Sequence, residues 1–143
     1  MKETTFTGKF VGAMRKAFPH MYAIKIHGHE MQSAFIPDTL FSINGLFVGI
    51  EFKIRRDGRI SIAPGQVKEI NKIKNSNGIG LIVACDEGSG KILIREKRID
   101  YRAIFLSTSN LSVKSKNIRI DWDFTFSNYD NAVDLIGVIV ENH

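Results

Sequence analysis

Residues 36–54 have the sequence IPDTLFSINGLFVGIEFKI, and this stretch decides the fold. Two apolar runs flank the dipeptide Asn44-Gly45. Asn-Gly between such runs is the strongest short-range signal of a tight hairpin, because both residues tolerate a positive φ. We therefore expect antiparallel strands over residues 34–43 and 46–54. The second run stays apolar until its charged end, which is typical of a central strand.

Three charged residues of this hairpin are expected to meet. Side chains alternate along a strand, so Glu51 and Lys53 share one face. Asp38 and Glu51 are equally far from the middle of the turn, so antiparallel pairing brings them opposite each other. Two carboxylates repel and need a cation, and Mg²⁺ or Mn²⁺ prefers oxygen ligands. With a lysine beside such an ion, the pattern predicts a site for phosphodiester hydrolysis.

The flanking sequence predicts an α/β protein with the element order αβββαβ. Apolar residues at helical spacing predict a helix over residues 3–18, which Pro19 ends. Tyr22, Ile24 and Ile26 alternate with their neighbours, which predicts a half-buried strand. Pro64 is suited to the start of a second helix, and the apolar run 79–84 predicts a buried strand. Further predicted elements are strands over 91–95 and 118–126 and a helix over 131–141.

Composition and charge narrow the classes of protein. The 143 residues are 43% hydrophobic and 24% charged, as in one globular domain. Runs of about 18 apolar residues and an apolar signal core are absent, which argues against a membrane span and against secretion. The single cysteine, Cys85, excludes an intramolecular disulfide and a Cys-rich zinc module. The 20 Lys and Arg exceed the 15 Asp and Glu, and the net charge of +5 suits a polyanionic partner.

The hairpin residues resemble a known nuclease motif. Ile36-Pro37-Asp38 followed by Glu51-Phe52-Lys53 resembles the motif of the PD-(D/E)xK nuclease superfamily. Within that superfamily the chain looks most like the small virus-type replication-repair (VRR-NUC) nucleases and the Holliday-junction resolvase group, over residues 3–84. The resemblance implies a restriction-endonuclease-like three-layer core, with a mixed central sheet flanked by helices. We expect a single nuclease domain over residues 1–143, with the core at 3–96 and a C-terminal extension at 97–143.

The resemblance also implies a function and its residues. Asp38, Glu51 and an early helical glutamate, matched here by Glu3, would bind Mg²⁺ or Mn²⁺, and Lys53 would position the attacking water. Gln66, near the start of the second helix, matches a glutamine that supports the site. Ile70 departs from an aromatic residue seen in some exonuclease relatives. The implied protein is a Mg²⁺-dependent deoxyribonuclease that cuts branched DNA as a homodimer. We expect it in the cytoplasm of a bacterial host, and its small size and motif spacing are typical of a phage or prophage gene product.

Each of these residues also has a simpler interpretation. In this interpretation Glu51 and Lys53 form an ordinary ion pair on the surface, and Asp38 is a turn residue. Glu3 then complements the dipole of its helix, and Gln66 caps a helix. The loop residues His27, His29 and Glu30 invite a zinc site, but no cysteine completes it. A basic cluster follows the motif, and it suits either a solvated face or a track for the DNA backbone. Its members are Arg55, Arg56, Arg59, Lys68 and Lys72. The alternative to a nuclease is a non-catalytic basic module that binds nucleic acid.

Overall fold

The computed structural model describes residues 2–25, 39–86, 91–94, 97–100, 104–107, 113–114, 117–118, 120 and 122–143. Its helices are α1 (Glu3–Ala17), α2 (Pro64–Asn75) and α3 (Tyr129–Glu141). The main sheet has the strand order β1-β2-β3-β4-β7-β10. Its strands are β1 (Tyr22–Lys25), β2 (Thr39–Ile43), β3 (Leu46–Arg55), β4 (Ile79–Asp86), β7 (Ile104–Ser107) and β10 (Phe124–Phe126). Two small two-stranded sheets pair β5 (Lys91–Ile94) with β6 (Lys97–Asp100) and β8 (Val113–Lys114) with β9 (Asn117–Ile118).

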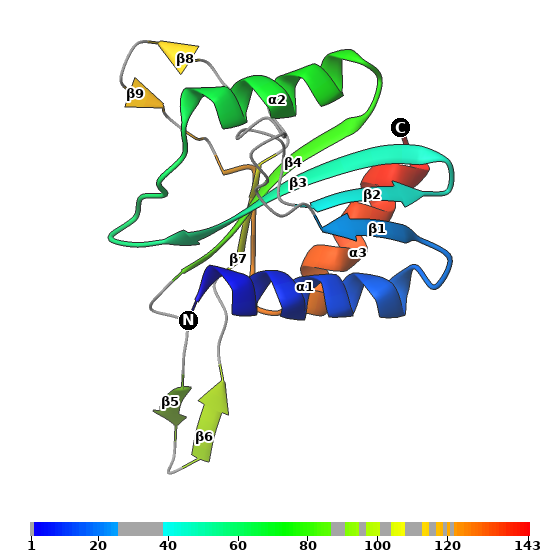
Figure 1. The fold of residues 1–143 in the computed structure, drawn as a ribbon. Coiled ribbons are helices and arrows are strands. Elements are labelled where there is room, and N and C mark those ends of the chain that lie inside the picture. Colours follow the sequence, from blue (N-terminus) through cyan, green and yellow to red (C-terminus); the bar gives the residue numbers. More distant parts are fainter. Residues whose placement is uncertain are drawn as a thin grey trace.

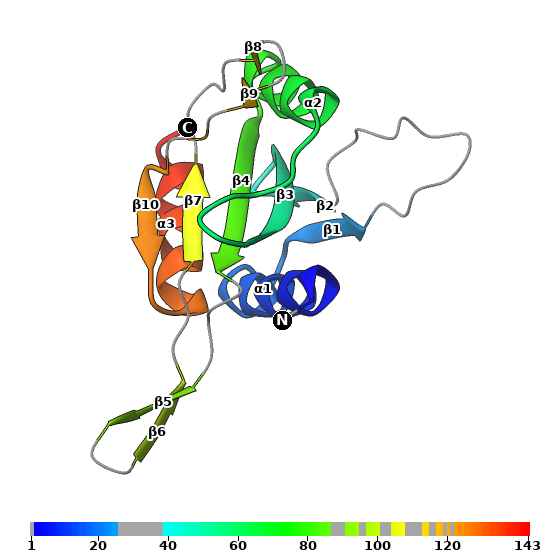
Figure 2. The ribbon, with the colours of Figure 1, turned by 90° about the vertical axis from the view of Figure 1, so that its left-hand side faces the viewer.

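The helices cover both faces of the main sheet and form three layers. α1 and α3 lie together on one face, and α2 packs on β3 and β4 from the other (Figures 1 and 2). β3 pairs antiparallel with β2 and parallel with β4, so it is a central strand of a mixed sheet. The predicted α/β class and the order αβββαβ are therefore confirmed.

The hairpin at Asn44-Gly45 forms as predicted. Both residues have a positive φ, 51° for Asn44 and 81° for Gly45. The β2–β3 register runs from the pair Ile43–Leu46 to the pair Thr39–Ile50, which is the register expected from the position of the turn. Because one face of the sheet is buried under α1, a slip by one residue would turn the whole apolar set outward.

Aromatic rings anchor the larger core between the sheet and the α1–α3 layer. Phe6 and Phe10 of α1 have ring centroids 5.8 and 5.4 Å from that of Phe52 on β3. Tyr129 of α3 lies 6.2 Å from both helix rings. Phe52 thus points toward α1 and α3, and its chain neighbours Glu51 and Lys53 point to the opposite face, where α2 lies.

Two predictions about strands need correction, and one strand was not predicted. The strand at Tyr22 exists, but Tyr22 and Ile24 are exposed and the half-buried Ala23 faces the core. The predicted strand over 118–126 is interrupted, because β9 ends at Ile118, β10 begins at Phe124, and Trp122 between them packs beside α2. β7 was not predicted, although it pairs with β4 inside the main sheet. Cys85 is buried, as expected.

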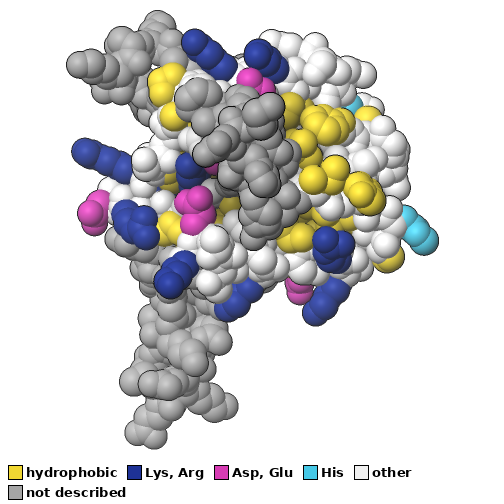
Figure 3. Space-filling view, viewed as in Figure 1, with side chains coloured by type: hydrophobic (Ala, Val, Ile, Leu, Met, Phe, Trp, Pro, Cys, Tyr) yellow, Lys and Arg dark blue, Asp and Glu magenta, His cyan; other side chains and the backbone are white. Residues whose placement is uncertain are grey.

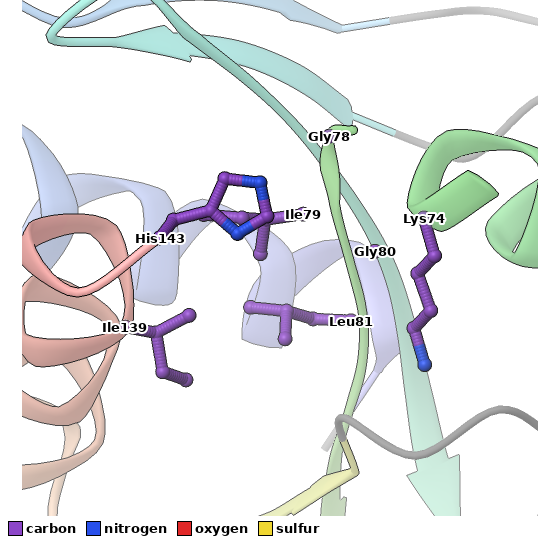
Figure 4. A pocket seen from close by; sticks show the side chains of 7 residues that line it. All are labelled: Lys74, Gly78, Ile79, Gly80, Leu81, Ile139 and His143. Atoms are coloured by element: carbon purple, nitrogen blue, oxygen red, sulfur yellow. The ribbon is translucent and has the colours of Figure 1, made fainter. Parts of the chain in front are cut away.

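A cavity of about 200 Å³ lies along the start of β4. Figure 4 shows Lys74 on one side of this strand and Ile139 and His143 on the other. His143 donates from Nε2 to the carbonyl oxygen of Asn77 over 2.8 Å, which joins the C-terminal residues to the α2–β4 turn. Burial lowers the pKa of the Lys74 ammonium, and the carboxylate of Asp123 partly offsets this effect.

Within the described ranges, every helix is too short or too polar to cross a bilayer.

Candidate active site

A buried carboxylate marks the candidate site. Glu51 lies in β3 with only 1% of its surface exposed, and its side chain projects between β3 and α2. A carboxylate is almost never buried unless it is paired, because removing its charge from water is costly. Glu51 therefore requires partners that stabilise its charge.

Lys53 and Gln66 are two such partners, and both contact the same oxygen. Gln66 donates from Nε2 to Oε1 of Glu51 over 2.9 Å. The ammonium Nζ of Lys53 lies 3.5 Å from that oxygen, and the lysine side chain is 12% exposed. An ion pair this well shielded is stronger than an exposed one, because water screens it less. The surface ion pair offered as the simpler interpretation is therefore wrong for Glu51 and Lys53.

The start of α2 fixes the orientation of Gln66. Pro64 occupies the first turn of this helix, where its missing N–H removes no helical hydrogen bond. The side-chain oxygen Oε1 of Gln66 accepts from the backbone N–H of Ala63 over 2.9 Å. The amide of Gln66 thus links the helix start to Glu51, since its oxygen caps the helix and its nitrogen contacts the carboxylate. The contact of Ala63 was not predicted, although proline followed by glutamine before an apolar stripe is a helix-start pattern.

The two other acidic candidates are placed differently. Asp38 lies outside the described residues, so its position opposite Glu51 stays a prediction. Glu3 is exposed in the first turn of α1, the helix that packs on the face of the sheet opposite to α2. Thr7, one turn further along α1, and Thr39, the residue after Asp38, line one cavity of about 220 Å³. The start of α1 therefore lies beside the start of β2.

The donor set suits a hard cation but is incomplete among the described residues. In the described part of the chain, no three His, Cys, Asp or Glu side chains lie close enough together to hold a metal ion. Glu51 supplies a carboxylate, the ligand type that Mg²⁺ and Mn²⁺ prefer. A second carboxylate would have to come from Asp38 or Glu3. His27, His29 and Glu30 lie outside the described residues.

The residues of the basic cluster lie at the end of β3, around the turn that follows it, and on α2. Arg56 and Arg59 exchange backbone hydrogen bonds of 2.8 and 2.9 Å around the turn at Asp57-Gly58, so they form a β-bridge with like charges opposite each other. Like charges directly opposite each other on paired strands repel. Of the remaining members, Arg55 is half-buried, Lys68 is exposed, and Lys72 is exposed beside Glu69 at 3.3 Å.

Comparison with known proteins supports the fold and gives no family assignment. No protein-family model matches the chain, and no curated protein matches it. Among solved structures it is similar to Hjc, a Holliday junction resolvase from the archaeal hyperthermophile Archaeoglobus fulgidus. The match covers 91% of this chain and 98% of that chain, with a TM-score of 0.59 and 15% sequence identity. The chain therefore shares the restriction-endonuclease-like fold of this resolvase, as the sequence predicted.

Proposed function

We propose that this protein is a metal-dependent DNA endonuclease of the PD-(D/E)xK type that acts on branched DNA. The observation that carries the proposal is the buried contact of Glu51 with Lys53 and Gln66 on the central strand of a resolvase-like fold. Burying a carboxylate and a lysine is costly, and such charged groups cluster at functional sites. The resemblance at Asp38, Glu51 and Lys53 adds support, and within the superfamily it points to the VRR-NUC and resolvase groups.

In the proposed mechanism each residue has a separate task. Asp38, Glu51 and Glu3 would hold Mg²⁺ or Mn²⁺, and the ion would supply Lewis-acid stabilisation of the phosphate charge. Lys53 places a cation beside the scissile phosphate and orients the attacking water. Gln66 is a positioning residue, because it fixes the carboxylate of Glu51 from the start of α2. Two copies acting as a homodimer would cut two strands of a branched substrate.

Cleavage of defined DNA structures tests this function. Labelled four-way junction, flap, duplex and single strand are incubated with Mg²⁺, Mn²⁺ or EDTA, and wild type is compared with Asp38→Ala. We expect cutting of branched DNA that requires the metal and is lost in the variant, while DNA binding remains. Symmetrical nicks on the junction would identify a resolvase. If no substrate is cut with either metal while DNA is still bound, the protein is the non-catalytic binding module instead.

The Arg56–Arg59 turn is expected to contact the DNA backbone. The double variant Arg56→Ala, Arg59→Ala removes two phosphate contacts, so the slope of log affinity against log salt should fall by about 2 in magnitude. Binding should weaken for every DNA sequence, because phosphates carry no sequence information. Fluorescence anisotropy across a salt series measures both effects.

The matched control is Lys9→Ala, Lys16→Ala, two exposed lysines on α1 at the opposite face of the sheet. It removes the same charge, so an equal loss of slope in this control would show that net charge alone binds the DNA.

A further inference from the structure

Three large apolar side chains lie exposed on β1 and β3. Tyr22 is 68% exposed, and Ile24 and Phe47 are each 48% exposed. The register places Tyr22 beside Ser42 and Ser42 beside Phe47, so two aromatic rings flank one small residue across three strands. We call Tyr22, Ile24 and Phe47 the apolar patch. Exposed apolar side chains that gather in this way mark a binding surface more often than scattered ones do.

The apolar patch shares its face of the sheet with Glu51. Phe47 and Glu51 are four residues apart on β3, so both point to the α2 face, about 13 Å apart along the strand. α2 packs on β3 and β4, and among the described helices none lies over β1 and β2 on this face (Figure 1). Figure 3 shows apolar side chains gathered over β1, β2 and the start of β3. The patch therefore lies on the same face of the sheet as the candidate active site, with Phe47 four residues before Glu51 on β3.

The size of the patch argues against a second copy of the chain as its occupant. Three side chains expose at most a few hundred Å², roughly the largest apolar patch of an ordinary monomer. A stable interface buries about 800 Å² on each partner. The chemistry of the apolar patch fits a smaller and flatter partner such as a nucleobase. The apolar π-face of a nucleobase stacks on Tyr and Phe rings.

We propose that Tyr22 and Phe47 form a stacking platform for unpaired nucleobases of the DNA strand beside the scissile phosphate. This inference rests on the proposed nuclease function and names the substrate class: branched DNA with a single-stranded segment at the branch. The 13 Å from Phe47 to Glu51 corresponds to about four steps of the 3.4 Å rise between nucleotides. The stacked bases therefore lie within about four nucleotides of the cleaved bond. The net charge of +5 supplies the attraction that brings the strand to the surface.

A fluorescent base tests the platform without cleavage. 2-Aminopurine is placed at one of positions 1–5 of the single-stranded arm of a flap, with a fully paired duplex as reference, and emission and affinity are measured in EDTA. We expect wild type to change the emission at the positions nearest the branch. Tyr22→Ser and Phe47→Ser should each lose this change and bind the flap about ten-fold more weakly, while duplex affinity stays constant. Tyr22→Phe should keep it.

The control Val138→Ser alters an apolar side chain that is 52% exposed on α3, away from the site, and should change neither signal. Equal losses on flap and duplex, or no loss, would overturn the platform. So would a dimer of wild type that becomes a monomer in both serine variants in sedimentation equilibrium, because the patch would then join two copies. Cleavage by wild type is measured separately: cutting without an emission change rejects the platform alone, and an emission change without cutting rejects the nuclease alone.

Discussion

Glu51→Gln is expected to lower metal-dependent cleavage by at least about 10²-fold, while the chain still folds and binds DNA. The substitution keeps the size of the side chain and an oxygen that can accept from Gln66. It removes the negative charge that offsets Lys53 at 3.5 Å and that would hold a cation. Single-turnover cleavage of a labelled junction at saturating Mg²⁺ measures the loss, and anisotropy in EDTA measures the retained binding.

The control for this variant is Glu69→Gln. Glu69 also accepts an ion pair from a lysine, Lys72 at 3.3 Å, but this pair lies on the outer side of α2. The Glu69→Gln variant should cleave like wild type, because this exposed ion pair lies away from Glu51 and contributes little to stability. Glu51→Gln leaves the shielded Lys53 without this carboxylate and should cost about 1–3 kcal/mol in the free energy of unfolding. Wild-type cleavage rates in folded Glu51→Gln would show that Glu51 is structural only.

Gly80→Ala is expected to destabilise the protein by about 1–3 kcal/mol, because α2 packs directly on β4 at this residue. A Cβ at Gly80 would lie 2.7 Å from the backbone oxygen of Ile70 and 3.0 Å from its Cγ2. A backbone atom in a packed helix cannot move aside as the end of a flexible side chain can, so α2 must shift. Urea unfolding followed by circular dichroism measures the change in free energy.

The same shift should weaken the site, because α2 carries Gln66 one turn before Ile70. Gly12→Ala is the matched control: no atom lies within 4 Å of a Cβ there, so it should stabilise the helix by about 0.5–1 kcal/mol. Equal stability of Gly80→Ala and wild type would mean that the helix can lift from β4 at no cost.

The parts of the fold predicted correctly depend on local rules. The hairpin follows from the positive φ that Asn44 and Gly45 adopt, and its register follows from the turn alone. The burial of β3 and β4 follows from continuous apolar runs. Glu51 and Lys53 were placed on one face by alternation, and the structure confirms their contact. The metal ligands were not settled in the same way, since Asp38 lies outside the described residues.

The parts that were missed depend on partners far away in the chain. β7 has no strong alternation of its own, and it becomes a strand because β4 offers an open edge next to it. The apolar residues of β1 were correctly assigned to a strand, but which face is covered depends on where α1 packs. The link from Ala63 through Gln66 to Glu51 needs a helix and a sheet to meet, which no local pattern specifies.

The contacts that Glu51 makes with Lys53 and Gln66 lie within residues 51–66, a short continuous segment of the chain. Groups this close in sequence find one another early in folding, since little loop-closure entropy opposes their meeting. β7, β10 and α3 contribute none of these three side chains and close the sheet and its core from the C-terminal side. Substitutions in that last third should therefore change the rate of unfolding more than the rate of the proposed cleavage.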